Sequence, residues 1–390
     1  MKQFLSSVCL LLAACILLIG CSEQKQQEPT EINADAQLDY TDVADFSNYP
    51  DYIRKQYDNR TFLDMEVAVP TPKQFNTYTA TLRIPDTQLW LDTFYPNNQN
   101  ELKKIEAPEG VITAQPDTDV GYTNSKTGSG IKISRELPAY GSSDNEGYGG
   151  SYGFLMRANG ALYPPMSKYA SDQELKSISK EEAVEQVNNI NEKLGLSVDQ
   201  PPEVYTLSYE NMRKVAAFPG YGSGVKEGYF IVYRCSLDNV PIFADYHAKV
   251  EVEDLIAGYG SAVSAIVTKD GLRQWDALAF YDTQLQQENV SIISLQTVLD
   301  SVSQRLAKAF EDRKSLINRA ELCYFPIADQ QYDLEVTLQP VWVVDTFSIA
   351  SDDISLENLE KFSKGQHVRY FIDATTGNYI ITGDVTRDPV

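Results

Sequence analysis

The residue types that carry out acid–base or metal chemistry are sparse in this chain. It has two histidines, His247 and His367, and neither has a Cys, Asp or Glu partner at the spacing of a zinc site. Both adjoin strand-like stretches, so we expect them to be surface strand residues. The motifs of a zinc-protease helix and of a phosphate-binding loop are missing from the sequence. Nucleophilic and zinc-dependent hydrolysis are therefore disfavoured, and we expect no metal and no other cofactor.

Carboxylates, in contrast, are abundant. The chain has 55 Asp and Glu residues, and the paired acids of glycosidases come from distant strands and leave no spacing in a sequence. A carboxylate-dependent hydrolase therefore remains a third alternative. The pairs in Asp117-Thr118-Asp119 and Asp352-Asp353 offer calcium-type ligands. Neither continues into a loop with the glycine and terminal glutamate of a calcium site, which disfavours calcium binding.

The first 21 residues form a targeting pattern. Lys2 precedes an apolar run, Val8–Ile19, and a small residue then precedes Cys21. This run is shorter than the roughly 20 residues that cross a bilayer. Leu18-Ile19-Gly20-Cys21 resembles the lipobox of bacterial lipoproteins. The resemblance implies that the Cys21 sulfur receives a diacylglyceryl lipid, with palmitate-type chains, and that cleavage makes Cys21 the first mature residue.

These features predict where the mature chain lies. Residues 1–20 would be a lipoprotein signal peptide, and residues 21–40, polar and without an aromatic residue before Tyr40, a flexible tether. We therefore expect a protein held by lipid at the extracytoplasmic face of the cell membrane. The formal net charge of −22 repels phosphate backbones and argues against a nucleic acid partner.

Two cysteines remain besides the signal peptide and the anchor. Cys235 and Cys323 each lie within an apolar strand pattern, where a free cysteine behaves as a small buried hydrophobic residue. We favour two separate buried thiols; the alternative, in a secreted chain, is a disulfide between them.

Residues 41–170 are rich in strand patterns and in glycine and proline. Alternation in Thr79–Ile84 and Gly130–Ser134 predicts strands. Clusters of glycine with tyrosine follow, and they recur in the second half of the chain. They place flat aromatic faces on loops, which is either a stacking platform for sugars or peptides or a set of ordinary turns. The candidate ligand-contact residues are Tyr140, Tyr148, Tyr152, Tyr221 and Tyr259.

Two helices organise the second half. Ser179-Lys180-Glu181-Glu182 is a capping box, and the helix it begins carries an apolar face and stops at Gly195. A second helix starts at Ser294, 115 positions later, and runs to about Phe310. Apolar strands follow each helix at similar offsets. Each segment closes with a hairpin, at Asp270-Gly271 and at Thr376-Gly377.

This repetition predicts an α+β fold. A β-rich domain, residues 41–170, would precede two repeated units of one helix packed on an antiparallel sheet, residues 171–285 and 286–390. The closing segment Ile372-Asp373-Ala374-Thr375-Thr376-Gly377 resembles that of PepSY-like modules in secreted and membrane-attached bacterial proteins. The chain as a whole resembles uncharacterised lipoproteins of Gram-positive gut bacteria and, more distantly, the Yyc regulators of a sensor kinase. The resemblance implies binding or regulation in the envelope, without catalysis.

We therefore expect a non-enzymatic envelope lipoprotein that binds or regulates a protein or peptide partner. The alternative is a lipoprotein that binds glycans or solutes through the glycine-tyrosine loops. The C-terminal hairpin formed by Val368–Ile372 and Tyr379–Ile381 is apolar with Arg369 as its main charge. We expect this hairpin either to be covered by the front domain or to contact a partner.

Overall fold

The structure is a computed structural model. It describes residues 40–41, 43–105, 120–135, 138–142, 174–196, 198, 201–208, 227–243, 251–252, 255–257, 260–309, 313–328, 335–349, 354–359 and 366–384. The predicted signal peptide and all of the predicted tether except Tyr40 lie outside these residues. Among the described helices, none combines the length and the apolar character that crossing a membrane requires.

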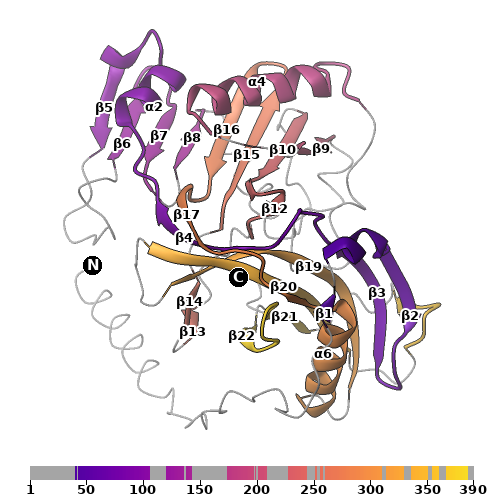
Figure 1. The fold of residues 1–390 in the computed structure, drawn as a ribbon. Helices are drawn as coiled ribbons and strands as arrows, with labels where there is room; N and C mark the ends of the chain where they lie inside the picture. The colour runs from indigo at the N-terminus through magenta and orange to yellow at the C-terminus, as the bar shows by residue number, and fades with distance from the viewer. Residues whose placement is uncertain are drawn as a thin grey trace, which may run out of the picture. The chain divides into compact units, whose positions relative to one another are not determined.

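The first large sheet has eight antiparallel strands in the order β5-β6-β7-β8-β16-β15-β10-β9 (Figure 1). Its two halves come from distant parts of the chain and meet where β8 pairs with β16. The strands are β5 (Leu102–Ile105), β6 (Val120–Asn124), β7 (Gly130–Ile133), β8 (Ala139–Gly141), β9 (Glu203–Leu207), β10 (Gly228–Arg234), β15 (Ala262–Thr268) and β16 (Gly271–Ala277).

Helix α4 (Lys180–Lys193) covers one face of this sheet (Figure 1). The predicted capping box is confirmed, because the Ser179 hydroxyl accepts from the Glu182 amide and the Glu182 carboxylate accepts from the Ser179 amide. Gly195 ends the helix with a φ of 66°, a conformation that glycine adopts without strain. Val187 of this helix belongs to the buried core of the first sheet.

A short helix, α2 (Thr87–Phe94), extends the same core. Asp86 caps it by accepting from the amides of Gln88 and Leu89. Trp90 then meets the ring of Trp275 edge-on, with 5.2 Å between the ring centroids. The front half of the chain therefore contributes to the core beneath the predicted second-half helix.

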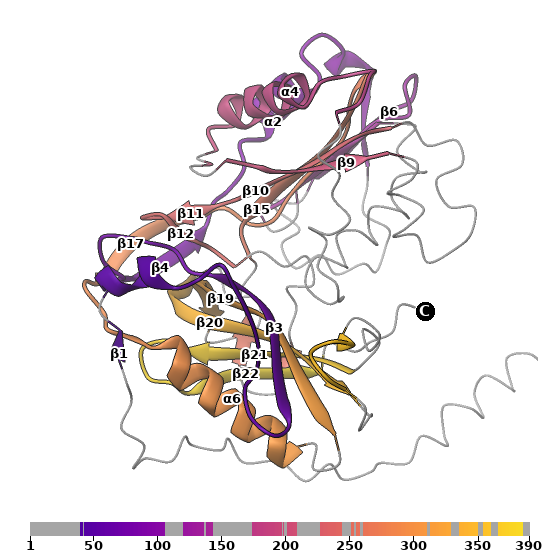
Figure 2. The ribbon, with the colours of Figure 1, turned by 90° about the vertical axis from the view of Figure 1, so that its right-hand side faces the viewer.

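The second large sheet has ten strands and is built on a long hairpin (Figure 2). β19 (Lys314–Ala328) and β20 (Glu335–Ile349) pair along almost their whole length. β3 joins β19 in parallel, and β4 and β21 join β20 at opposite ends. The other members are β2 (Tyr52–Gln56), β3 (Thr61–Ala68), β4 (Thr77–Leu82), β13 (Glu251–Val252), β14 (Leu255–Ala257), β17 (Tyr281–Gln287), β21 (Gln366–Asp373) and β22 (Tyr379–Asp384).

Helix α6 (Leu295–Ala309) packs along one face of this sheet (Figure 2). Its buried Val298, Val302 and Leu306 share a core with Trp342 of β20. The opposite face carries the aromatic cluster of Phe243, Phe325 and Phe371, whose ring centroids lie 4.8–5.4 Å apart. This part of the second sheet is therefore covered on both faces.

Short elements complete the described fold. β1 (Tyr40–Thr41) pairs with β18 (Ile292–Ile293), and β11 (Ser236–Leu237) pairs with β12 (Val240–Pro241). The 3-10 helices are η1 (Val43–Asn48) and η2 (Gln99–Glu101). The predicted hairpin glycines are confirmed, since Gly271 and Gly377 have φ angles of 95° and 76°.

The predicted α+β fold class, with a β-rich front domain and repeated helix-on-sheet units, is wrong. The described part of the chain is mostly β, with 22 strands and three α-helices. Front-half strands are members of both large sheets: β5–β8 continue the first, and β2–β4 belong to the second. The local patterns identified strands correctly, but an alternating pattern does not specify which distant strand becomes the neighbour.

Candidate functional site

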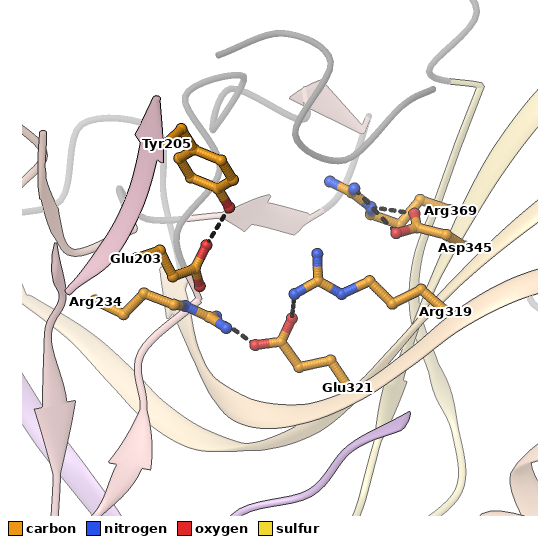
Figure 3. Close-up of polar contacts among 7 residues, drawn as sticks. All are labelled: Glu203, Tyr205, Arg234, Arg319, Glu321, Asp345 and Arg369. Carbon is orange, nitrogen blue, oxygen red and sulfur yellow. Dashed lines mark hydrogen bonds and ion pairs between the residues drawn. The ribbon is translucent and has the colours of Figure 1, made fainter. Parts of the chain in front are cut away.

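A row of alternating charge crosses three neighbouring strands of the second sheet (Figure 3). Arg319 of β19 lies opposite Asp345 of β20, which lies opposite Arg369 of β21. Arg369 Nε donates to Asp345 Oδ1 at 2.6 Å and Nη2 donates to Oδ2 at 3.2 Å. The two side chains are 6% and 3% exposed. This two-point contact therefore keeps both buried charges paired.

Glu321 links this row to the first sheet. Its carboxylate accepts from Arg319 Nη2 at 2.7 Å and forms an ion pair with Arg234 of β10. Burial raises the pKa of Glu321, but Arg234 and Arg319 outweigh burial and hold that pKa below its ordinary value. Glu321 in turn raises the pKa of Arg319, against the effect of burial. The two sheets therefore meet through a fixed, ionised contact.

Tyr205 and Glu203 of β9 extend the cluster on the side of the first sheet (Figure 3). The Tyr205 hydroxyl donates to Glu203 Oε2 at 2.5 Å. Burial, and then the Glu203 charge, raise the pKa of Tyr205 above its usual range. A phenol held protonated, an ionised Glu321 and guanidiniums do not exchange protons near neutral pH. These seven residues, which we name the charged interlock, suit a structural contact better than acid–base catalysis.

Sequence reasoning missed the charged interlock. The available signal was charge inside apolar strands: Arg319 and Glu321 flank Ala320, and Asp345 follows Val344. Charged residues are rarely buried unless they are paired. The sequence thus marks them as members of some pairing. Arg369, the partner of Asp345, is distant in the sequence, and Arg234, the second partner of Glu321, lies on the other sheet.

Of the tyrosines predicted to contact a ligand, Tyr140 is described. It lies on β8, stacks on Phe94 with 4.8 Å between ring centroids, and meets Tyr95 edge-on. The ring is thus engaged in packing beneath α2. Tyr148, Tyr152, Tyr221 and Tyr259 lie outside the described residues, as do Cys21 and His247. His367 lies in β21, as its strand-like setting predicted.

The prediction of two separate buried thiols is confirmed. Cys235 and Cys323 are not joined by a disulfide, and both are buried. Burial raises the pKa of the Cys323 thiol well above its ordinary value, with a further contribution from Glu321. A protonated, buried thiol is a poor nucleophile, so Cys323 has a packing role.

Asp276 of β16 differs from the acids of the charged interlock. Its carboxylate accepts a hydrogen bond from the Gln274 side-chain amide. Burial raises the pKa of Asp276 to about 7. Within the described residues no three His, Cys, Asp or Glu side chains gather as metal ligands would. The two calcium candidates, at Asp117–Asp119 and Asp352–Asp353, lie outside the described part of the chain.

β17 is an edge strand that lies open to solvent. Among the described strands it pairs only with β4. Every side chain from Asp282 to Gln287 is exposed, and Leu285 is 50% exposed although it is large and apolar. Asp282 pairs with Arg83 at 2.9 Å on the surface. The stretch from Thr283 to Gln287 carries no charge.

A polar hollow of ≈ 760 Å³ lies at the end of β17. Strands β4, β17 and β20, the loop 289–291 and the turn after β21 supply its nine lining residues. Eight of them are hydroxyl or amide side chains and the ninth is Val290, so none carries a charge or a carboxylate. The hollow therefore lacks the paired acids that a carboxylate-dependent hydrolase requires.

Comparison with known proteins gives a likeness of fold. A solved structure of an uncharacterised protein from Eubacterium rectale matches 87% of this chain and 99% of its own, with a TM-score of 0.59 and 16% sequence identity. No family model and no curated protein matches the chain. The match agrees with the expected likeness to uncharacterised gut-bacterial proteins at the level of the fold, and it gives no link to PepSY-like modules or Yyc regulators.

Proposed function

We propose that this protein is a non-catalytic envelope lipoprotein, anchored through Cys21, that binds an extended segment of a partner protein along β17. The observation that carries the proposal is the open edge of β17, which pairs with β4 alone among the described strands. An edge strand presents unpaired main-chain groups, and an extended peptide satisfies them by adding a strand to the sheet.

The side chains of β17 are more consistent with an edge that binds a partner than with one protected against pairing. Natural edges are usually guarded by lysine, proline or inward-pointing charge. β17 has no lysine or proline, and its one charged residue, Asp282, is paired with Arg83. A bulge between Leu285 and Gln287 is its only described irregularity. The uncharged stretch Thr283–Gln287 therefore fits a segment with uncharged side chains.

Charge favours a different protein over a second copy of this chain. The formal net charge is −22, so two copies approaching edge to edge would repel each other over much of their surface. A partner of neutral or positive charge meets no such barrier. The charged interlock supports a binding role over catalysis, because its acids are held by guanidiniums or by a phenol.

In-cell photocrosslinking tests the docking surface. A photoreactive residue at Gln284 should give a partner band, whereas one at Glu185, exposed on α4, should give none. Leu285→Lys should abolish the Gln284 band because a lysine guards the edge, and Glu185→Lys should leave it unchanged. A band that persists in Leu285→Lys, or crosslinks within this chain only, would reject the proposal.

Fractionation tests the anchor separately. Only a thiol accepts the lipid, so Cys21→Ser should either release the protein from the membrane fraction or leave it uncleaved. Metabolic labelling with a palmitate analogue should mark the wild type and not the variant. If Cys21→Ser fractionates and migrates like the wild type, the lipid anchor is wrong, whatever the result at β17.

A further inference from the structure

We propose that the polar hollow is a second binding site, which takes a neutral, hydroxyl-rich ligand, that is, a glycan. The site goes beyond partner binding at the β17 edge, because it lies across the face of the sheet. Three adjacent strands line its floor with Thr77 of β4, Gln286 and Gln287 of β17, and Thr337 and Gln339 of β20.

The lack of charged residues in the lining of the hollow limits the class of ligand. Charged residues make up 23% of the chain, yet none is among the nine lining residues. A phosphate, carboxylate or ammonium group bound there would lose water without gaining a counter-charge, which is costly. The hollow therefore favours an uncharged ligand.

The hydrogen-bonding groups of the hollow narrow the class of uncharged ligands further. Threonine and serine hydroxyls and glutamine and asparagine amides each offer both donors and acceptors. Sugar hydroxyls also donate and accept, so the two sets are complementary. The Thr77 hydroxyl already donates to Gln286 Oε1 at 3.3 Å, which orients one amide over the hollow.

The main chain of the floor argues against a peptide ligand in the hollow. β4 pairs with β17 on one side and with β20 on the other. Strand addition needs free main-chain groups, and the centre of this floor has its neighbours in place on both sides. Side chains alone are offered there, and these suit a glycan.

Saturation-transfer NMR on the full chain in detergent tests the site with maltotetraose, cellotetraose and tetra-N-acetylchitotetraose as neutral probes. Tetragalacturonic acid serves as the anionic probe, and a neutral Thr/Gln octapeptide as the peptide probe. We expect at least one neutral glycan to bind with a Kd of about 1 mM, because the hollow offers hydrogen bonds with little apolar area. Gln339→Ala and Gln286→Ala should each weaken binding at least five-fold.

Gln284→Ala is the matched control, since Gln284 is exposed on β17 but does not line the hollow. It should leave glycan binding unchanged. Failure of all three neutral glycans to bind, equal binding by the anionic glycan, displacement by the peptide, or insensitivity to both hollow variants would overturn the site. Loss of crosslinking in Leu285→Lys with intact glycan binding would show that the two surfaces act independently.

Discussion

The hairpin β21–β22 and the strand pair β4–β17 both extend from β20, yet they meet their surroundings in opposite ways. In the hairpin, Tyr370 and Ile372 belong to the core beneath α6, and Phe371 packs with Phe243 and Phe325 on the other face. In β17, six consecutive side chains are exposed. The described side chains of β21 are thus covered on both faces of the sheet, whereas those of β17 are exposed, although β22, like β17, pairs with a single described strand.

This difference shows that the more apolar strands are not the ones whose side chains are exposed to a partner. The C-terminal hairpin is the more apolar of the two, and the sequence predicted it to be either covered by the front domain or a contact for a partner. Its described cover comes from α6 and the aromatic cluster: the Tyr379 hydroxyl lies 2.9 Å from Ser301, and Arg305 lies 4.3 Å from the Tyr379 ring. The strand left open is the one rich in threonine and glutamine.

The largest loss of stability is expected when the packing of α6 on the hairpin is disrupted. Val302 is fully buried on α6, so Val302→Asp places an unpaired charge in the core and should destabilise the fold by about 4 kcal/mol. Val187→Asp should act similarly beneath α4, since Val187 is equally buried. Urea unfolding measures both. Glu185→Asp, on the exposed face of α4, is the control and should change stability by less than about 0.5 kcal/mol.

An Arg–Asp pair on each extension provides a matched test. Asp345→Ala leaves Arg369 buried without its partner and should cost about 3 kcal/mol. Asp282→Ala breaks a pair whose side chains are 42% and 66% exposed, so it should cost less than about 0.5 kcal/mol. Equal losses of unfolding free energy in the two variants would contradict the contrast between enclosed and open extensions.

A smaller effect isolates the contact between α6 and the hairpin return. Tyr379→Phe removes the hydroxyl that meets Ser301 and keeps the ring beside Arg305. It should lower stability by about 1 kcal/mol, measured as a shift of the urea midpoint. Ser301→Ala should give a similar loss, and the double variant should add little to either. Fully additive losses would mean that the two hydroxyls do not interact.

The smallest effect on stability is expected at the open edge. Leu285→Lys replaces a side chain that is half exposed and should change the unfolding free energy by less than about 0.5 kcal/mol. Ile372→Lys, within the enclosed hairpin and fully buried, should destabilise by several times more. A large loss in Leu285→Lys would show that β17 is packed against something in the isolated chain.

Local features of the fold were predictable from the sequence. Ser179 and Glu182 specify a helix start by reciprocal hydrogen bonds, and Gly271 and Gly377 specify hairpins by their tolerance of positive φ. Each of these depends on neighbours within a few residues. The sequence motifs and the structure agree at these helix starts and hairpins because no contact with a distant residue is needed to form them.

Long-range pairing was not predictable in the same way. β3 lies parallel to β19 although some 250 residues separate Thr61 from Ser315, and its alternation would suit many neighbours. The charged interlock depends on that same long-range assembly, because Arg234 meets Glu321 only when the two sheets come together. Whether the outer edge of β17 is paired is likewise decided by how the sheet assembles, and the residues of β17 do not specify it.

Amide hydrogen exchange on the purified, lipidated full chain in detergent, without a partner, tests the open edge most directly. Outward-facing amides of an edge strand have no ladder partner, so alternate amides of β17 should exchange almost without protection. Amides of Tyr370–Ile372 in β21 should exchange only when the sheet opens, several orders of magnitude more slowly. Protection of every β17 amide at the level of β21 would show that the edge is already covered and would contradict the account.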